Sequence, residues 1–368
     1  MSTQALFEPL KVGPYTLSHR VVMAPLTRMR ATKPGNHANA MNAEYYAQRA
    51  TRGGLIIAEA SQVLQGGAPG PGTPGIHTPE QVAGWKLVVD AIHAKGGLVF
   101  LQLWHVGRLS NAAQQPDGGP AIGASAIAAP GTRVVRGENV PYETPRALRL
   151  DEIPGIIEAY AQAARNAMEA GFDGIEIHAA NGYLLEQFMQ SRSNQRTDAY
   201  GGSIENRARL VLEVTAACAQ VWGSDRVGIR LSPFGVANGS GEDDPMPLYS
   251  HVIGALNRMG LAYLHLIEPR ASGAGQREVD HQGVPSAAEL FRPAWNGVLS
   301  AAGNFKPDTA TAMVEKGDAD AIAFGRYFIS NPDLPERIRV GAPFTPYNRP
   351  TFYTSGPEGY LDYPAMSA

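Results

Sequence analysis

Cysteine is nearly absent from this chain of 368 residues, in which Cys218 is the single example. One cysteine excludes internal disulfides and iron–sulfur clusters held by cysteine thiolates. The apolar residues around Cys218 recur with the spacing of a helix, so we expect a buried structural thiol.

Charge blocks and long apolar runs are missing as well. Lys and Arg number 31 and Asp and Glu number 34, which gives a net charge of −3 with no block of either sign. Nucleic acid and anionic membranes are therefore poor partners. No apolar run reaches 18 residues, and the first residues lack the basic and apolar regions of a secretion signal. We expect a cytoplasmic protein, a monomer or homodimer, that acts on a small molecule.

Common metal and nucleotide motifs are also missing. The nine histidines are scattered, with no HExxH or HxxxH pair, and we predict no metal site. There is no P-loop, and no GxGxxG follows a strand to open a helix, which argues against a separate nucleotide-binding domain. Two alternatives stay open: His178 as a metal ligand, and Glu59 with Glu176 as paired carboxylates for glycoside hydrolysis.

Short apolar runs alternate with amphipathic helical stretches along the chain. Hydrophobic residues make up 44% and charged residues 18%, which allows a large core. Eight strand–helix pairs with nearly all-apolar strands predict an α/β fold in which a parallel sheet closes into a (β/α)8 TIM barrel. No sequence break divides the chain, so we expect one domain over residues 1–368. The expected strands are residues 21–25, 55–58, 98–104, 174–178, 227–232, 263–267, 297–301 and 321–325.

Two segments depart from the strand–helix repeat. Residues 6–17 contain Gly13-Pro14 at a turn and predict an N-terminal β-hairpin across the amino-terminal end of the barrel. Residues 105–149 form a long loop insertion after the third strand, rich in Gly, Pro and Ala. A loop of that length in a barrel is usually a cover for the active site, and a floppy insertion is the alternative.

Polar residues gather where the fourth expected strand ends, which in a (β/α)8 barrel is the end that carries the active site. Period-two alternation over residues 174–178 puts the two isoleucines on one face and His178 on the other. Asn181 and Tyr183 follow on the next turn. His and Asn can both donate hydrogen bonds to one oxygen, and Tyr can deliver a proton. This set suits an enzyme that draws charge onto a substrate oxygen and then protonates a carbanion. The alternative is a polar strand terminus with a locally satisfied histidine.

The loops after the seventh and eighth strands predict a phosphate site. Gly303 and Gly325 allow backbone amides to approach an anion, and Arg326 adds charge-assisted bonds. The alternative is that both glycines are only turn residues.

A phosphorylated ligand held there would extend its other end over the barrel mouth. Two further side chains would meet the middle of that ligand. Gln102 has a donor and an acceptor that match the edge of an isoalloxazine ring. Arg230 would stabilise the anion of a reduced flavin beside it. The alternative for Arg230 is a structural pair with Glu176, since both would point into the barrel.

Taken together, these motifs resemble the old yellow enzymes, and are similar to those of bacterial N-ethylmaleimide and nitrate-ester reductases. The resemblance runs nearly end to end, and the run 194–207 is too long and specific for a chance match. The other matching stretches include residues 6–10, 20–28, 75–81, 102–108, 178–183, 230–233, 323–326, 331–334 and 359–364.

The resemblance implies an ene-reductase that holds FMN non-covalently and works by a ping-pong mechanism with NADPH or NADH as reductant. It implies that His178 and Asn181 bind the oxygen of an α,β-unsaturated carbonyl, maleimide or nitro compound, and that Tyr183 protonates the α-carbon. Trp104 and Tyr353 would line the substrate pocket, and Thr27 would bond flavin O4. The cofactor residues implied are Pro25, Thr27, Ala60, Gln102, Arg230, Gly303, Asn304, Gly325 and Arg326.

One position departs from the family pattern. Relatives with the closest motifs carry a tyrosine in the loop after the second strand, where this chain has Gly70. A pocket wall is then missing, and the size of the preferred substrate does not carry over.

Three rival functions remain. A flavin barrel that oxidises hydroxy acids would need a base to abstract a proton, whereas the set here is donors and an acid. A barrel aldolase or isomerase would usually need a metal or a Schiff-base lysine, and no strand end carries a lysine. A catalytically silent binding barrel would have no use for His178, Asn181 and Tyr183 together.

Overall fold

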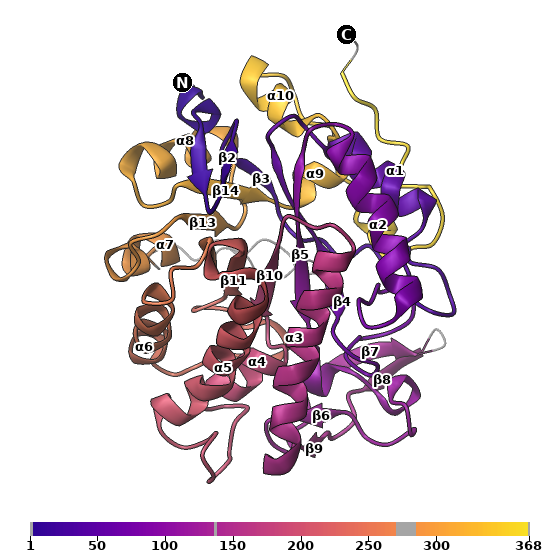
Figure 1. The fold of residues 1–368 in the computed structure, drawn as a ribbon, viewed down its shortest axis with the longest axis vertical. Helices are drawn as coiled ribbons and strands as arrows, with labels where there is room; N and C mark the ends of the chain where they lie inside the picture. Colours follow the sequence, from indigo (N-terminus) through magenta and orange to yellow (C-terminus); the bar gives the residue numbers. More distant parts are fainter. Residues whose placement is uncertain (1–2, 136–137, 270–284, 367–368) are drawn as a thin grey trace.

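Eight parallel strands close into a single barrel, as the sequence predicts (Figure 1). The computed structural model of the chain describes residues 3–135, 138–269 and 285–366. Neighbouring barrel strands follow the order β10-β11-β12-β13-β14-β3-β4-β5. These strands are β3 (Val21–Met23), β4 (Leu55–Gln62), β5 (Leu98–Trp104), β10 (Gly174–Ala179), β11 (Val227–Leu231), β12 (Tyr263–Ile267), β13 (Leu299–Ala302) and β14 (Ala321–Phe324).

Helices surround the barrel and alternate with its strands (Figure 1). None of the helices in the described ranges is long and apolar enough to cross a membrane. Two short helices, α4 (Leu184–Met189) and α9 (Arg326–Ser330), follow β10 and β14 and were not predicted. The other helices are α1 (Ala40–Arg49), α2 (Pro79–His93), α3 (Ile153–Glu169), α5 (Ile204–Trp222), α6 (Pro245–Asn257), α7 (Ala287–Phe291), α8 (Pro307–Lys316) and α10 (Leu334–Val340).

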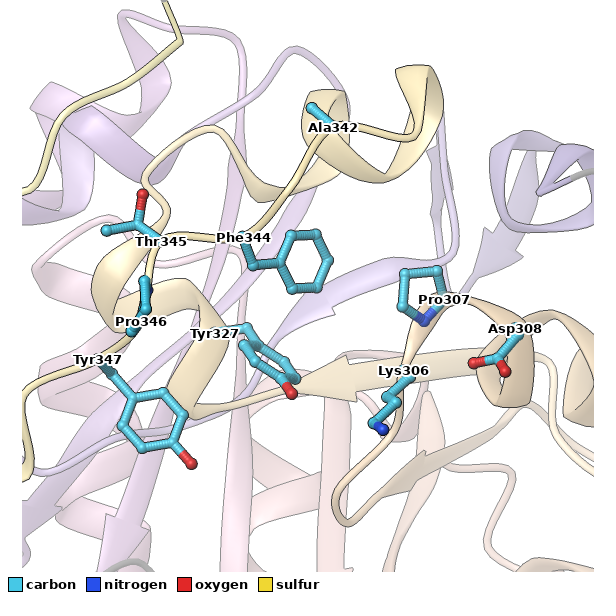
Figure 2. Close-up of a pocket in the computed structure, with 9 residues that line it drawn as sticks. All are labelled: Lys306, Pro307, Asp308, Tyr327, Ala342, Phe344, Thr345, Pro346 and Tyr347. Atoms are coloured by element: carbon cyan, nitrogen blue, oxygen red, sulfur yellow. The ribbon is translucent and has the colours of Figure 1, made fainter.

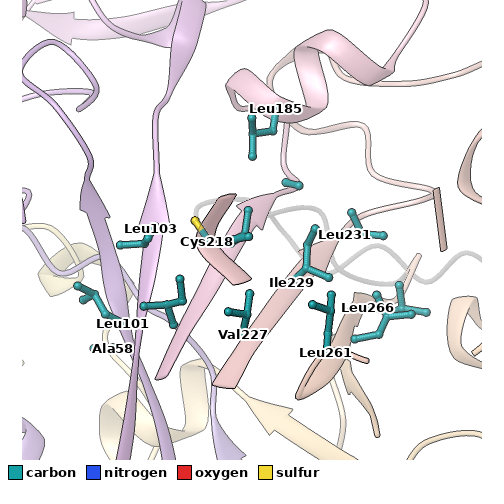
Figure 3. Packing of buried hydrophobic residues seen from close by; sticks show 14 of the residues in the cluster. Ala58, Leu101, Leu103, Leu185, Cys218, Val227, Ile229, Leu231, Leu261 and Leu266 are labelled. Carbon is teal, nitrogen blue, oxygen red and sulfur yellow. The ribbon is translucent and has the colours of Figure 1, made fainter. Parts of the chain in front are cut away.

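The outer faces of the strands pack against the helices to form the main hydrophobic core (Figure 3). Ile175 and Ile177 of β10 belong to this core, which confirms the alternation expected for that strand. Cys218 of α5 lies in the same core and is fully buried, as predicted. Burial raises the pKa of its thiol to about 12, so the group stays protonated at neutral pH.

The inside of the barrel has an apolar layer at its amino-terminal end. The predicted hairpin forms there from β1 (Leu10–Val12) and β2 (Tyr15–Leu17), and Val12 and Leu17 pack into this layer. Gly228 makes room for a ring, because a Cβ at this position would lie 2.3 Å from the ring of Tyr263. The hairpin therefore closes one end of the barrel and leaves the opposite end for chemistry.

The long insertion after β5 is folded over its described residues. It carries β6 (Ile122–Gly123) paired with β9 (Arg146–Ala147), and an antiparallel hairpin of β7 (Thr132–Val135) and β8 (Glu138–Pro141). Figure 1 places these small sheets near α4, at the end of the barrel opposite the N-terminal hairpin. The alternative of a floppy insertion is therefore wrong for the described part of this segment.

Candidate active site

Three aromatic side chains meet at the carboxyl-terminal end of the barrel. The ring centroids of His178 and Trp104 lie 6.1 Å apart with nearly parallel planes. The Tyr183 ring stands almost perpendicular to both, with its centroid 4.9 Å from each. Trp104 ends β5 and His178 lies on β10, while Tyr183 is the N-cap of α4. The structure thus brings together three of the residues predicted for the substrate site.

The imidazole of His178 is arranged to donate from Nε2. Its Nδ1 accepts a hydrogen bond from the Ala180 amide at 3.3 Å, which assigns the proton of the neutral ring to Nε2. Burial, together with the nearby positive charge of Arg230, holds the pKa of His178 well below its usual value. Within the described residues Nε2 forms no hydrogen bond. A neutral donor is therefore left for a ligand oxygen.

Asn181 lies on the turn between β10 and α4 in a left-handed conformation, with φ of 58°. Asparagine tolerates this backbone region better than other non-glycine residues. The backbone of Asn181 bonds Ser232 and Asn238, whereas no hydrogen bond of its side-chain amide is formed within the described part of the chain. Its amide can thus serve as the second donor that the sequence predicts.

The Tyr183 phenol stays protonated at neutral pH. Burial raises its pKa, and the hydroxyls of Tyr353 and Tyr142 raise it further. Tyr142 follows β8 in the long insertion and packs with Trp104 and Tyr183 in a small apolar cluster. The sequence indicated that the insertion covers the site, but nothing in it singled out Tyr142.

Tyr353 comes from the C-terminal segment and is 44% exposed. Two buried arginines hold this segment against the loop after β3. Arg28 donates to the carbonyls of Phe352 and Gly359 at 3.1 and 2.7 Å, and Arg30 donates to the carbonyls of Phe352 and Thr351. A segment far away in sequence is thereby brought near Tyr183.

A polar layer lies inside the barrel below this aromatic group. Gln102 Nε2 donates to Glu176 Oε1 at 2.7 Å, and His265 Nδ1 lies 2.8 Å from Glu176 Oε2. The Glu176 oxygens are thus used by Gln102 and His265, and the described residues contain no ion pair between Glu176 and Arg230. The structural pairing considered for Arg230 is therefore wrong.

Arg230 is a half-buried cation on β11, at the register position that pairs with His178 of β10. Burial lowers the pKa of its guanidinium, and its Nε has no hydrogen-bond partner within the described residues. The nearby charge of Glu176 opposes that fall, although within the described residues it makes no ion pair with the guanidinium. This orphaned donor fits a ligand that presents carbonyl oxygens or negative charge at the barrel mouth, as the edge of FMN does.

Ala60 faces this site because of an irregularity in β4. The pairing of β4 with β5 shifts register between Ala58 and Ser61. Within the shifted stretch Ala60 packs with Trp104, while Glu59 accepts hydrogen bonds from the amide of Arg28 and the hydroxyl of Tyr46. The expected strand stopped at residue 58, four residues before β4 ends. Glu59 and Glu176 are both buried, and each carboxylate is bonded to groups of the protein itself.

The predicted phosphate loops lie side by side at the ends of β13 and β14. Gly303 and Asn304 follow β13 with φ of 141° and 51°, and Gly325 is the N-cap of α9, which begins at Arg326. Within the described residues the backbone amides of Gly303, Asn304 and Gly325 donate no hydrogen bond. Such orphaned amides suit a phosphate.

Pro25 and Thr27 lie in the loop after β3, at the same end of the barrel. Pro25 is buried and Thr27 is half-buried. Their contact with a cofactor stays a prediction, as do the individual roles of the other predicted residues.

A separate hollow of about 670 Å³ lies near the phosphate loops (Figure 2). It is formed by the start of α8, by α9 and by the segment after α10, and it includes none of the predicted site residues. Its lining is Lys306, Pro307, Asp308, Tyr327, Ala342, Phe344, Thr345, Pro346 and Tyr347.

Comparisons with known proteins identify the family of the chain. Residues 5–344 match the family described as NADH:flavin oxidoreductase / NADH oxidase. The chain is 46% identical to 12-oxophytodienoate reductase 2 of Arabidopsis thaliana, covering 99% of this chain and 96% of that protein. It is also 46% identical to the putative 12-oxophytodienoate reductase 11 of Oryza sativa subsp. japonica, covering 99% and 98%.

Solved structures are similar over almost the whole chain. Morphinone reductase in complex with tetrahydroNAD superimposes with a TM-score of 0.90 at 46% identity, covering 98% of both chains. The old yellow enzyme homologue from Zymomonas mobilis has a TM-score of 0.92 at 41% identity, covering 98% of this chain and 99% of the other.

Proposed function

Because the chain belongs to the NADH:flavin oxidoreductase / NADH oxidase family, among its old yellow enzyme members, we propose that it reduces activated carbon–carbon double bonds. It is an NAD(P)H-dependent oxidoreductase that uses FMN. The substrates proposed are α,β-unsaturated carbonyl compounds, maleimides and nitroalkenes. The observation that carries the proposal is the meeting of a neutral His178 donor and a protonated Tyr183, with ring centroids 4.9 Å apart, beside the half-buried cation Arg230.

Bound FMN supplies hydride transfer, from NAD(P)H in one half-reaction and to the β-carbon of the substrate in the other. His178 Nε2–H and the Asn181 amide donate to the substrate oxygen, which draws electron density away from the double bond. Tyr183 then gives its hydroxyl proton to the α-carbon. Its raised pKa keeps the phenol protonated until a strong carbon base forms beside it.

The residues proposed to hold the cofactor fall into two groups. Gln102, Arg230 and Thr27 would bond the polar edge of the ring system, and Pro25 and Ala60 would line it. Gly303, Asn304, Gly325 and Arg326 would hold the phosphate. The orphaned Arg230 Nε and the orphaned amides of the phosphate loops support this division.

Trp104, Tyr353 and Tyr142 would form walls of the substrate pocket. Gly70 leaves one wall open, because a Cβ at this position would meet no atom within 4 Å. We propose that residues 1–368 act as a single FMN-binding domain, since the barrel and its helices share one large hydrophobic core.

Product analysis tests the proposal directly. The purified protein, reconstituted with FMN, is incubated with NADPH and 2-cyclohexenone, and the products are separated by gas chromatography. Stoichiometric cyclohexanone is expected. A protein that binds no FMN, or that consumes NADPH with oxygen but leaves the enone unchanged, would refute an ene-reductase.

A further inference from the structure

The turn that carries Asn181 has an unusual backbone. Asn181 and Gly182 are both left-handed, with φ of 58° and 76°. Asn and Gly enter this region at a lower cost than other residues, and contacts with neighbouring segments decide how such a turn is oriented. Gly182 also lies close to the loop after β11, since a Cβ there would be 2.7 Å from the carbonyl oxygen of Ala237. Something must therefore hold this turn in place.

The carboxylate of Glu186, in the first turn of α4, forms the central contact under this turn. Its side chain is fully buried. Oε2 accepts the Gly182 amide at 2.5 Å, and Oε1 accepts the hydroxyls of Ser232 at 2.6 Å and Tyr249 at 2.7 Å. Ser232 Oγ in turn accepts the Asn181 amide at 2.9 Å. Both left-handed residues are thus tied to Glu186, one directly and one through Ser232.

These bonds are made by a carboxylate that no cation neutralises. Within the described residues Glu186 forms no ion pair with Lys, Arg or His. Burial raises the pKa of Glu186 to about 7, and the bonds from Ser232, Gly182 and Tyr249 oppose that rise. A buried acid without a counter-ion is costly, and the three donors that it satisfies in and beside the turn offset that cost.

We propose that Glu186 is a positioning residue, which fixes the Asn181–Gly182 turn and so sets the placement of the Asn181 amide and the Tyr183 hydroxyl over the substrate. The inference rests on the proposed function for its kinetic consequence, but not for the geometry of the turn. His178 lies on β10 itself and does not depend on this contact. Loss of Glu186 should therefore impair Asn181 and Tyr183 while the His178 donor stays in place.

A matched set of variants tests this role. Glu186→Leu removes both acceptor oxygens. Glu186→Gln keeps one acceptor for the Gly182 amide, and the Ser232 and Tyr249 hydroxyls can turn to accept from the new amide group. Gln190→Leu is the control, because Gln190 is also buried at the end of α4 and bonds Tyr249 and the Gly241 amide but neither residue of the turn. This variant takes one bond from Tyr249 and leaves both Glu186 oxygens in place.

The first readout is hydrogen–deuterium exchange in the holoenzyme, which does not depend on turnover. The Asn181 and Gly182 amides should exchange at least about tenfold faster in Glu186→Leu, because both lose an anchored acceptor. Glu186→Gln should stay within about twofold of wild type, and Gln190→Leu should leave these two amides protected even if its melting temperature falls.

The second readout separates the two half-reactions. Glu186→Leu should slow reoxidation by an enone about tenfold or more relative to reoxidation by a nitroalkene, whose product anion needs no immediate proton. Glu186→Gln should restore the ratio. If Glu186→Leu does not fold, Ser232→Ala removes the Asn181 anchor and should change both readouts in the same direction.

Unchanged exchange and an unchanged enone-to-nitroalkene ratio in a folded Glu186→Leu or Ser232→Ala variant would overturn the inference. If instead the proposed function is wrong, the result differs, because the enone would then not reoxidise even the wild-type enzyme.

Discussion

At the scale of single residues, period-two alternation over β10 correctly separated His178 from the two core isoleucines. The same reasoning cannot place Ala60, because the register shift in β4 exchanges the faces of the strand. It also missed Tyr142 and Glu186, whose positions depend on contacts between segments far apart in sequence. Local patterns therefore predict which strand end carries the chemistry but not every side chain that converges on it.

The His178 donor can be tested by ligand binding alone. Phenols mimic an enolate, and their oxygen should accept from His178 Nε2 and the Asn181 amide. His178→Ala should weaken the binding of a phenol by about 2–4 kcal/mol, the usual value of one oxyanion-type donor. The measurement is titration of the long-wavelength charge-transfer band. Equal affinity in the variant and wild type would show that His178 does not contact the ligand oxygen.

The Tyr183 acid can be tested by comparing half-reactions. Tyr183→Phe removes the proton donor but leaves the His178 and Asn181 donors, so reduction by NADPH should stay nearly intact. Reoxidation by an enone should slow by about 10²–10⁴, the usual contribution of a general acid, and reoxidation by a nitroalkene should suffer less. Stopped-flow absorbance follows both steps. Equal slowing of both half-reactions, or none in enone turnover, would assign the proton to water or another residue.

At the scale of elements, the sequence predicted the N-terminal hairpin and the structured cover over the barrel mouth, because turn residues and segment length are local properties. It did not predict α4 and α9, which have only six and five residues and are too short to develop a helical period. The conformation of the loop around Gly70 could not be predicted from the sequence either, since its Gly and Pro residues are compatible with several turn types.

The loop at Gly70 should control substrate size. The space around its Cβ position is open, and its φ lies outside the left-handed range, so a side chain fits there. Gly70→Tyr should raise KM for bulky enones by about tenfold, corresponding to roughly 1–2 kcal/mol of lost contact, with a smaller effect on cyclohexenone. Steady-state kinetics with a size series makes the comparison. The same rise for small and bulky enones would mean that this loop does not line the pocket.

At the scale of the whole molecule, all eight predicted strands occur in the closed barrel, because nearly all-apolar runs separated by helices have few other packing solutions. The same pattern does not predict which polar groups are buried. Glu59 is an example, since it is 1% exposed and its carboxylate is bonded by the amide of Arg28 and the hydroxyl of Tyr46.

Ionisation of Glu59 should contribute to the pH dependence of the free energy of unfolding. Burial raises its pKa from 4.5 to about 7, so the unfolded chain loses this proton at lower pH than the folded protein. Its contribution to the free energy of unfolding is then full below about pH 4.5 and is lost as the pH rises to about 7, by at most about 3 kcal/mol. Urea unfolding at pH 5 and pH 8 measures this change.

The comparison needs two variants. Glu59→Gln cannot titrate and should lose less stability between pH 5 and pH 8 than wild type does. Glu44→Gln, which removes an exposed carboxylate on α1, is the control for a change in net charge. The same pH dependence in wild type and Glu59→Gln would show that Glu59 does not ionise between these limits.

The central claim is that this barrel passes hydride from NAD(P)H to an activated alkene through bound FMN. Anaerobic titration of the holoenzyme tests it most directly, with the visible absorbance of the flavin followed throughout. One equivalent of NADPH should bleach the flavin, and one equivalent of 2-cyclohexenone should then restore the oxidised spectrum without oxygen. A flavin that NADPH bleaches but that no enone or nitroalkene reoxidises would contradict the account.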